Sequence, residues 1–265
     1  MANDPHSLDR YARQTNFEAL GLAGQRKLLG STALIVGLGG LGSWIAELLA
    51  RSGVGRLRLV DDDRLELMNI HRQGLYDEVA GMAGVHKVEA AAARLAQLNH
   101  QVRVEPIPQR LDAQNIEQLA HGVDLVIDGT DNFATRFIIN DWCVLTDRPW
   151  IFGGVVQAQG QVMTIPGSIG PCLRCVFEQP PQPSAELRAT TAGVLPPAVA
   201  VVAALQACEA LKILSGRSER VSPYLLRLDL WTNQVQRIDV ARSSRHGHCP
   251  CCRGRRFEFL YPPAH

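Results

Sequence analysis

The sequence predicts an α/β fold: a Rossmann-like, doubly wound and mostly parallel sheet with a C-terminal antiparallel extension. Strand and helix patterns alternate through the first half of the 265 residues, as they do where crossover helices join parallel strands. A glycine-rich turn links the first predicted strand directly to a helix. Near the other end, two alternating segments predict an antiparallel hairpin.

The first half contains four predicted strands. They are short apolar runs at residues 32–36, 56–60, 102–105 and 123–127. Helices are predicted where apolar or alanine residues recur at helical spacing, at residues 41–51, 87–98 and 133–146. The second and fourth strands run into aspartates, Asp61 to Asp63 and Asp128, so carboxylates should gather at one edge of the sheet.

The second half begins with two more predicted strands, at residues 150–156 and 160–165. Residues 166–197 are rich in proline and show little periodicity, which indicates a mobile connection. One long buried helix is predicted at residues 198–214. The hairpin is predicted at residues 225–230 and 235–240, with Asn233 in its turn. We expect a single domain over residues 1–265, with a nucleotide-binding half at 1–150 and a second half at 151–265.

Composition and charge exclude several classes of protein. Lys+Arg 27 against Asp+Glu 26 leaves a formal net charge of +1, so no nucleic-acid partner is expected. The longest apolar stretch, residues 194–205, is shorter than the roughly 20 residues that a membrane span needs. The N-terminus lacks an apolar leader segment, so we expect a cytoplasmic protein.

The glycine-rich turn carries the first chemical signal. Gly37, Gly39 and Gly42 form G-x-G-x-x-G between a strand and a helix, where backbone N–H groups can approach a phosphate. Asp61, 24 residues after Gly37, is placed to accept hydrogen bonds from a ribose. A dinucleotide and a mononucleotide fit this motif equally well, and glycines that serve only close packing would also produce it.

Cations and carboxylates downstream favour a triphosphate. Arg72 and Lys87 follow the glycine turn, and a triphosphate needs such charge neutralised before an anionic nucleophile can approach. Asp131 and Asn132 follow a strand at the carboxyl edge of the sheet, where ligands of such sheets bind. A carboxylate facing a triphosphate is a natural Mg²⁺ ligand.

Two C-x-x-C pairs predict a metal site. CLRC and CPCC supply four thiolates of metal-type spacing, Cys172, Cys175, Cys249 and Cys252. A closed four-thiolate site favours structural Zn²⁺ or an iron–sulfur centre, and free thiols or a redox pair are the alternatives. Cys251 leaves the second pair ambiguous. Cys143 and Cys208 are expected to be small buried hydrophobic residues.

In order along the chain, these motifs resemble those of the ThiF/MoeB/HesA family, which is related to the activating domains of ubiquitin-activating enzymes. The matching segments are RYARQ, GLGGLGS, LVDDD, MNIHRQ, GVHK, GTDNFATR, CLRC, TAGVLPP, WTN and CPCC, from Arg10 to Arg253. The resemblance implies an enzyme that uses ATP and Mg²⁺ to adenylate the C-terminal Gly-Gly carboxylate of a ubiquitin-like sulfur carrier. Thiamine and molybdopterin biosynthesis use such carriers, named ThiS and MoaD.

The resemblance also implies roles for individual residues. Arg13, Arg72, Lys87 and Asp131 would be catalytic, with Arg13 reaching the nucleotide site of the partner in a homodimer. The nucleotide would be held by Gly37, Gly39, Gly40, Gly42, Asp61, Asp63, Asn69, Arg72, Gln73, Lys87, Asp131 and Asn132. Asp131 would bind Mg²⁺, and the two cysteine pairs would bind Zn²⁺. The half at 151–265 would hold the crossover connection, the zinc site and the carrier.

One position departs from the family pattern. Where several relatives carry a cysteine before the TAGV segment, this chain has Ala189. We therefore expect the reaction to stop at the adenylate, with sulfur supplied by a separate cysteine desulfurase or rhodanese. The sequence leaves the carrier open, with WTN followed by the last cysteine pair favouring the thiamine branch. The alternatives are adenylation of a peptide C-terminus in natural-product synthesis, an NAD-dependent oxidoreductase and a non-catalytic scaffold.

Overall fold

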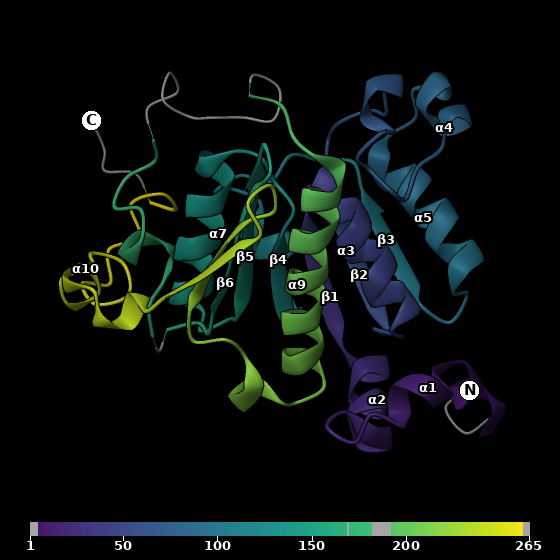
Figure 1. Cartoon of the computed structure of the whole chain (residues 1–265), viewed down its shortest axis with the longest axis horizontal. Coiled ribbons are helices and arrows are strands. Elements are labelled where there is room, and N and C mark those ends of the chain that lie inside the picture. The colour runs from purple at the N-terminus through teal and green to yellow at the C-terminus, as the bar shows by residue number, and fades with distance from the viewer. Residues whose placement is uncertain (1–4, 169, 182–191, 262–265) are drawn as a thin grey trace.

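The structure, a computed structural model, describes residues 5–168, 170–181 and 192–261 (Figure 1). Eight strands form one mixed sheet in the order β3-β2-β1-β4-β5-β6-β7-β8. Neighbours from β3 to β5 are parallel and those from β5 to β8 are antiparallel, so the predicted fold class is confirmed. The strands are β1 (Thr32–Val36), β2 (Arg56–Val60), β3 (Arg103–Ile107), β4 (Leu125–Asp128), β5 (Trp150–Val156), β6 (Gln159–Ile165), β7 (Leu225–Asp229) and β8 (Gln234–Ile238).

The helices cover both faces of this sheet. The α-helices are α1 (Ala12–Thr15), α2 (Gly21–Gly30), α3 (Gly40–Arg51), α4 (Glu78–Ala83), α5 (Lys87–Leu98), α6 (Ile116–Leu119), α7 (Phe133–Leu145), α9 (Pro196–Leu214) and α10 (Ser244–Gly247). Short 3₁₀ turns are η1 (Pro5–Tyr11), η2 (Leu67–Asn69), η3 (Leu173–Cys175), η4 (Ser218–Arg220) and η5 (Val240–Arg242).

Alternation along the buried strands divides the core into two layers. Ala33 and Ile35 of β1 belong to the layer that includes residues of α3, α5 and α9. Leu34 and Val36 of the same strand belong to the opposite layer, with residues of α7 and the four paired cysteines. Successive side chains of a strand point to opposite faces, so one short apolar run serves both layers.

The register brings three strand ends level at the carboxyl edge of the sheet. Val36 at the end of β1 pairs with Val60 of β2 on one side and with Asp128 of β4 on the other. The loops that follow these strands therefore leave the sheet together. Strand β3 continues to Ile107, beyond its predicted end, because Pro106 lies on an edge strand where its missing N–H is tolerated.

Helix α9 begins at Pro196 and is apolar nearly all round. By length and composition it could cross a membrane, but half of its most apolar window is buried, and it packs on α3 and on strands β4 to β6. Burial of this kind is typical of a core helix. Cys143 is buried as expected, whereas the prediction for Cys208 is wrong because this thiol is exposed. It follows Val201, itself partly exposed, by two helical turns, so both lie on the uncovered face of α9.

Candidate functional site

A cavity of about 790 Å³ lies at the carboxyl edge of the parallel strands. Its walls come from the loops after β1, β2 and β4, from the start of α5, and from strands β5 and β6. Figure 1 shows α4 and the turns around it at this end of the sheet, with α1 and α2 at the other end. The cavity is thus where open α/β sheets bind their ligands.

The glycine turn forms one wall of the cavity. Gly37 has a φ of +83°, and a Cβ there would lie 2.8 Å from the backbone of Gly129, so the turn packs directly on the loop after β4. Gly39 and Gly40 line the cavity, and α3 begins at Gly40 with its N-terminal N–H groups at this wall. A helix N-terminus presented in this way favours an anionic group such as a phosphate.

Gly42 does not line the cavity. A Cβ at this position would lie 1.8 Å from the carbonyl oxygen of Gly37, so the residue allows α3 to pack against the turn that precedes it. Gly42 therefore supports the glycine turn from behind, through the close approach that the third glycine of such motifs allows.

Asp61 ties the glycine turn to the end of β2. Its Oδ2 accepts the Leu38 N–H at 2.6 Å, and its Oδ1 accepts the Asp63 N–H at 2.8 Å. Burial raises the pKa of Asp61, an effect that Lys87 opposes. The carboxylate lines the cavity as predicted. It also fixes the loop that faces the ligand, a role that the sequence did not suggest.

The predicted cations lie in the same cavity. Lys87, 6% exposed, donates to Asp63 Oδ2 over 2.6 Å. Arg72 donates to the Met68 carbonyl over 3.0 Å and lines the cavity with Lys87. Gln73 is 2% exposed, and its Oε1 has no hydrogen-bond partner within the described residues. A buried acceptor without a partner is costly, so Gln73 fits a polar ligand in the cavity.

Asn69, Asp131 and Asn132 also line the cavity, but their side chains are engaged differently. Asn69 Oδ1 accepts the Glu66 N–H at 3.2 Å, and Asn132 Oδ1 accepts the Thr135 N–H at 2.9 Å, which caps α7. Asp131 is exposed, and within the described part of the chain its carboxylate has no recorded partner. A carboxylate that is free at the edge of a phosphate-sized cavity suits a Mg²⁺ ion.

Arg13 is not part of this cavity. It lies exposed on α1, which precedes α2 and the start of β1, whereas the cavity is at the other end of β1. Its guanidinium therefore cannot serve the nucleotide site of its own chain in this arrangement. The expected action of Arg13 at the site of a second copy of the chain stays a prediction.

The four paired cysteines form a buried cluster. Cys172, Cys175, Cys249 and Cys252 place their sulfur atoms within 4.8 Å of one another. Cys172 Sγ lies 3.7 Å from Cys249 Sγ, and Cys175 Sγ lies 3.5 Å from Cys252 Sγ. A ZnS₄ tetrahedron with bonds of about 2.3 Å has edges of roughly 3.8 Å, so the cluster fits a zinc ion.

Cys251 stands outside this set. Its sulfur accepts from Asn140 Nδ2 at 3.3 Å and lies beside the carboxyl group of Asp141. Burial raises the pKa of Asp141 to about 6. A backbone hydrogen bond from Phe259 acts in the opposite direction, but the effect of burial is larger. Cys251 also interacts with Cys172, but the metal-sized cluster contains Cys249 and Cys252, so the fold favours these two of the CPCC cysteines as the ligands.

Two groups near these sites were missed by sequence reasoning. His246 Nδ1 lies 3.3 Å from Cys175 Sγ, and its Nε2 lies 2.7 Å from Arg253 Nη2. Since arginine only donates, this contact assigns the ring proton to Nδ1, which then donates to the sulfur. Arg136, on α7, lines the main cavity and pairs with buried Asp128. Its place as the last residue of the GTDNFATR segment, in a largely apolar helix, was the available signal for it.

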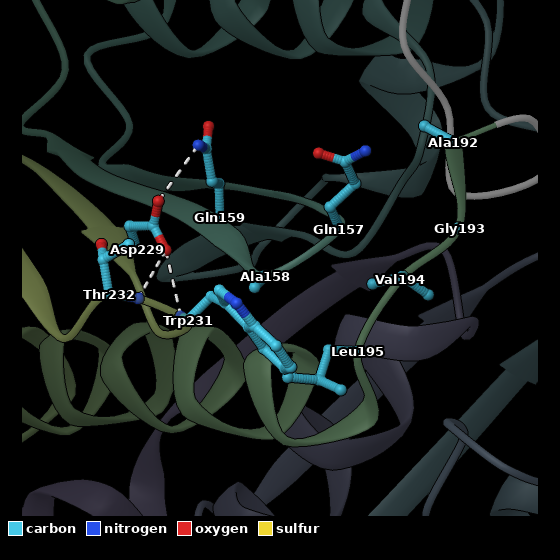
Figure 2. Close-up of a pocket in the computed structure, with 10 residues that line it drawn as sticks. All are labelled: Gln157, Ala158, Gln159, Ala192, Gly193, Val194, Leu195, Asp229, Trp231 and Thr232. Carbon is cyan, nitrogen blue, oxygen red and sulfur yellow. Dashed lines mark hydrogen bonds between the residues drawn. The ribbon is translucent and has the colours of Figure 1, made fainter.

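A second cavity of about 470 Å³ adjoins the first (Figure 2). The two share Gln159 and Val194 in their walls. Trp231, 79% exposed, reaches toward Leu195 across one side, and Asp229 accepts hydrogen bonds from Gln159 Nε2 and the backbone of Trp231. The backbone N–H of Leu195 donates to the Gln157 carbonyl, which anchors the start of α9 to this wall.

The profile of the ThiF family matches residues 11–251 of the chain. The chain belongs to the ThiF family. The sulfur carrier protein adenylyltransferase of Thermus thermophilus is 40% identical over 250 residues, which cover 92% of this chain and 90% of the relative. The sulfur carrier protein ThiS adenylyltransferase of Bacillus subtilis is 39% identical over 252 residues, 95% of this chain and 73% of that protein.

A solved structure of low sequence identity shares the fold. The structure of E. coli MccB with MccA-N7isoASN superimposes with a TM-score of 0.80 at 22% identity, over 94% of this chain and 75% of that one. The resemblance found in the sequence motifs is confirmed at the level of the family by the profile match and by the two relatives. Ala189 lies outside the described residues, as does the middle part of the proline-rich connection that was predicted to be mobile, residues 182–191.

Proposed function

We propose that this ThiF-family protein is an adenylyltransferase that uses ATP to activate the C-terminal glycine carboxylate of a ubiquitin-like sulfur carrier. The observation that carries the proposal is the main cavity, where the N-terminus of α3, Lys87, Arg72 and the free Asp131 carboxylate meet. These groups suit a triphosphate beside a metal ion. The names of the two relatives, both sulfur carrier adenylyltransferases, support the carrier as substrate.

The chemistry needs charge neutralisation more than proton transfer. The carrier's carboxylate is ionised at pH 7, so its oxygen attacks the α-phosphorus of ATP without a general base. The bond from that phosphorus to the bridging oxygen of pyrophosphate breaks, which leaves an acyl-adenylate and free pyrophosphate. Lys87 and Arg72 offset the charge of the phosphates, and the α3 N-terminus orients them.

Two metal ions belong to the proposal. Asp131 is the residue that would hold Mg²⁺, which supplies further neutralisation of the phosphate oxygens. The four cysteines of the cluster would hold a structural Zn²⁺, which ties the C-terminal segment to the turn at Cys172–Cys175. A closed set of four buried thiolates leaves no open position for a substrate, so its role is in stability.

The second cavity suits the approach of the carrier's tail. It shares Gln159 and Val194 with the wall of the main cavity, so an extended chain end lying in it would be directed toward the α-phosphorus. We expect Trp231→Ala to raise the KM for the carrier while the KM for ATP stays the same. Tyr261→Ala, which removes another exposed aromatic ring outside both cavities, is the matched control.

The remaining features of the proposal concern assembly and surroundings. The protein acts as a homodimer in which Arg13 of one chain completes the site of the other. A separate cysteine desulfurase or rhodanese supplies the sulfur, and the reaction takes place in the cytoplasm. Residues 1–150 bind the nucleotide and residues 151–265 bind zinc and the carrier, within one domain.

ATP–pyrophosphate exchange tests the proposed function. Purified protein is assayed with Mg²⁺ and with ThiS-like and MoaD-like carriers, each with and without its terminal glycine. We expect exchange only with an intact Gly-Gly end, and the carrier that supports it identifies the pathway. ATP binding without exchange for any carrier would refute the carrier as substrate and favour a peptide C-terminus.

A further inference from the structure

Asp128 and Arg136 form a buried ion pair directly below the loop that carries Asp131. Asp128, the last residue of β4, is fully buried, and its Oδ2 accepts from Arg136 Nε at 2.8 Å. Its Oδ1 accepts both the backbone N–H of Thr130 at 2.9 Å and the Thr130 hydroxyl at 2.7 Å. One carboxylate therefore holds the arginine on one side and the loop on the other.

The guanidinium of Arg136 completes the attachment of this loop. Its Nη2 donates to the Thr130 carbonyl at 2.7 Å and to the Gly153 carbonyl of β5 at 2.9 Å. The rings of Phe133 and Phe152 each lie 5.1 Å from its central carbon, which fixes the plane of the group. A planar fork with several donors makes these bonds together, and a lysine cannot reproduce that geometry.

A buried ion pair of this kind is weak evidence for a role in stability. Moving two charges out of water is costly, and well-packed apolar residues in place of a buried ion pair are often as stable or more so. What the pair does fix is the backbone of Thr130, the residue before Asp131. Asn132, the residue after it, is fixed by capping α7. The backbone is thus fixed on both sides of Asp131, whose own carboxylate is free. Arg136 and Asp128 provide one of these two attachments.

The same loop also touches the glycine turn. The Gly129 N–H donates to the Val36 carbonyl at 2.7 Å, and a Cβ on Gly129 would lie 2.3 Å from the carbonyl oxygen of Gly37. With no free space between the two loops, a displacement of Thr130 and Gly129 would also move the wall at Gly37. A displacement of the ion pair would therefore shift both the Asp131 carboxylate and the glycine turn at Gly37.

We propose that Arg136 and Asp128 are positioning residues that set the Asp131 carboxylate at the distance from the nucleotide that metal-assisted adenylation requires. The inference rests on the proposed function to the extent that Asp131 acts on a metal–nucleotide complex. It assigns no contact between Arg136 and the substrate. Its consequence is that loss of the pair changes the metal dependence of the site, even where the fold is intact.

The test compares Arg136→Lys, Arg136→Met and the double variant Asp128→Leu/Arg136→Met, which leaves no unpaired buried charge. Arg58→Met is the matched control, because Arg58 also donates to backbone carbonyls and pairs with a glutamate, at a site away from the cavity. For each protein, the Mg²⁺ concentration at half-maximal nucleotide binding is measured by calorimetry. The kcat and both KM values are measured by ATP–pyrophosphate exchange, and folding by thermal unfolding.

We expect the folded double variant to need about tenfold more Mg²⁺, as metal sites do when supporting partners are lost. Its kcat should fall by about 100-fold, the cost of a misplaced catalytic group, with the carrier KM unchanged. For Arg136→Lys, both the Mg²⁺ requirement and kcat should lie between those of the double variant and the wild type. Arg58→Met should change neither the Mg²⁺ requirement nor kcat. A folded double variant with wild-type Mg²⁺ dependence and kcat would overturn the proposal.

The two proposals fail separately. Nucleotide binding and its Mg²⁺ dependence are measured without any carrier, so absence of exchange in the wild type refutes the carrier reaction and leaves the positioning role testable. Wild-type nucleotide binding that is independent of Mg²⁺ would overturn the positioning role itself.

Discussion

The cysteine cluster offers the sharpest quantitative prediction. Structural zinc in a four-ligand site contributes about 10–16 kcal/mol, or about 2.5–4 kcal/mol for each ligand if shared evenly. Cys172 Sγ lies 3.7 Å from Cys249 Sγ and 4.0 Å from Cys175 Sγ, and Cys172 is fully buried. Cys172→Ser should therefore weaken zinc binding by about 10²–10³-fold.

The loss of zinc affinity also appears as a loss of stability. With zinc in excess over its dissociation constant, the free energy of unfolding falls by the same amount, about 2.5–4 kcal/mol. For a chain of this size that is a fall in melting temperature of roughly 5–15 °C. The assay combines zinc content by elemental analysis with thermal unfolding. Cys208→Ser, at an exposed position on α9, is the control that should change neither.

Cys251→Ala separates the two interpretations of the CPCC pair. Cys251 is buried, so its loss should lower stability, but the zinc content should remain one ion per chain because its sulfur bonds to Asn140. Full zinc and an unchanged melting temperature in Cys172→Ser would refute the ligand assignment. So would loss of zinc in Cys251→Ala, because it would place Cys251 in the ligand set.

Three further predictions concern the nucleotide site and the pH dependence of folding. Asp131→Ala should abolish ATP–pyrophosphate exchange and leave thermal unfolding unchanged, because the exposed carboxylate contributes little packing; normal turnover would remove Asp131 from the site. When Arg13→Ala and Lys87→Ala proteins are mixed, each heterodimer should recover one working site. If the chains are shown to exchange between dimers and no activity returns, the action of Arg13 in trans is refuted. Burial raises the pKa of Asp141 to about 6 from 3.8, so the native state binds the extra proton and loses stability as pH rises from about 4 to 6. Asp141→Asn lacks this loss, and urea unfolding should show its stability relative to wild type growing by about 2.5 kcal/mol between pH 4 and 7, whereas a constant difference would contradict the assignment.

Most of the residues that line the main cavity were predictable because they follow strands of a parallel sheet. Asp61 and Asp131 come from loops after β2 and β4, and the level register of those strands brings them to one cavity. The glycine turn and Lys87 follow from the same topology. Local sequence spacing places such residues on loops, and the alternation of strands and helices then fixes which edge those loops share.

The wrong prediction for Cys208 and the missed pairing of Arg136 with Asp128 have one cause. A sequence pattern does not show what covers a side chain. Helix α9 is apolar nearly all round, so its composition did not reveal that the face with Cys208 is uncovered. Arg136 and Asp128 are eight positions apart in the chain, and their pairing depends on how α7 packs across the end of β4.

The sequence by itself determined the fold class, the family, the glycine turn and the two cysteine pairs, because each depends on local spacing and residue chemistry. Only the tertiary structure decided which cysteines meet, since 73 residues separate Cys175 from Cys249 and Cys251 competes with both its neighbours. It also decided that Gly42 packs while Gly40 faces the cavity. These outcomes depend on distances between segments far apart in the chain, which only the packing of helices on the sheet can set.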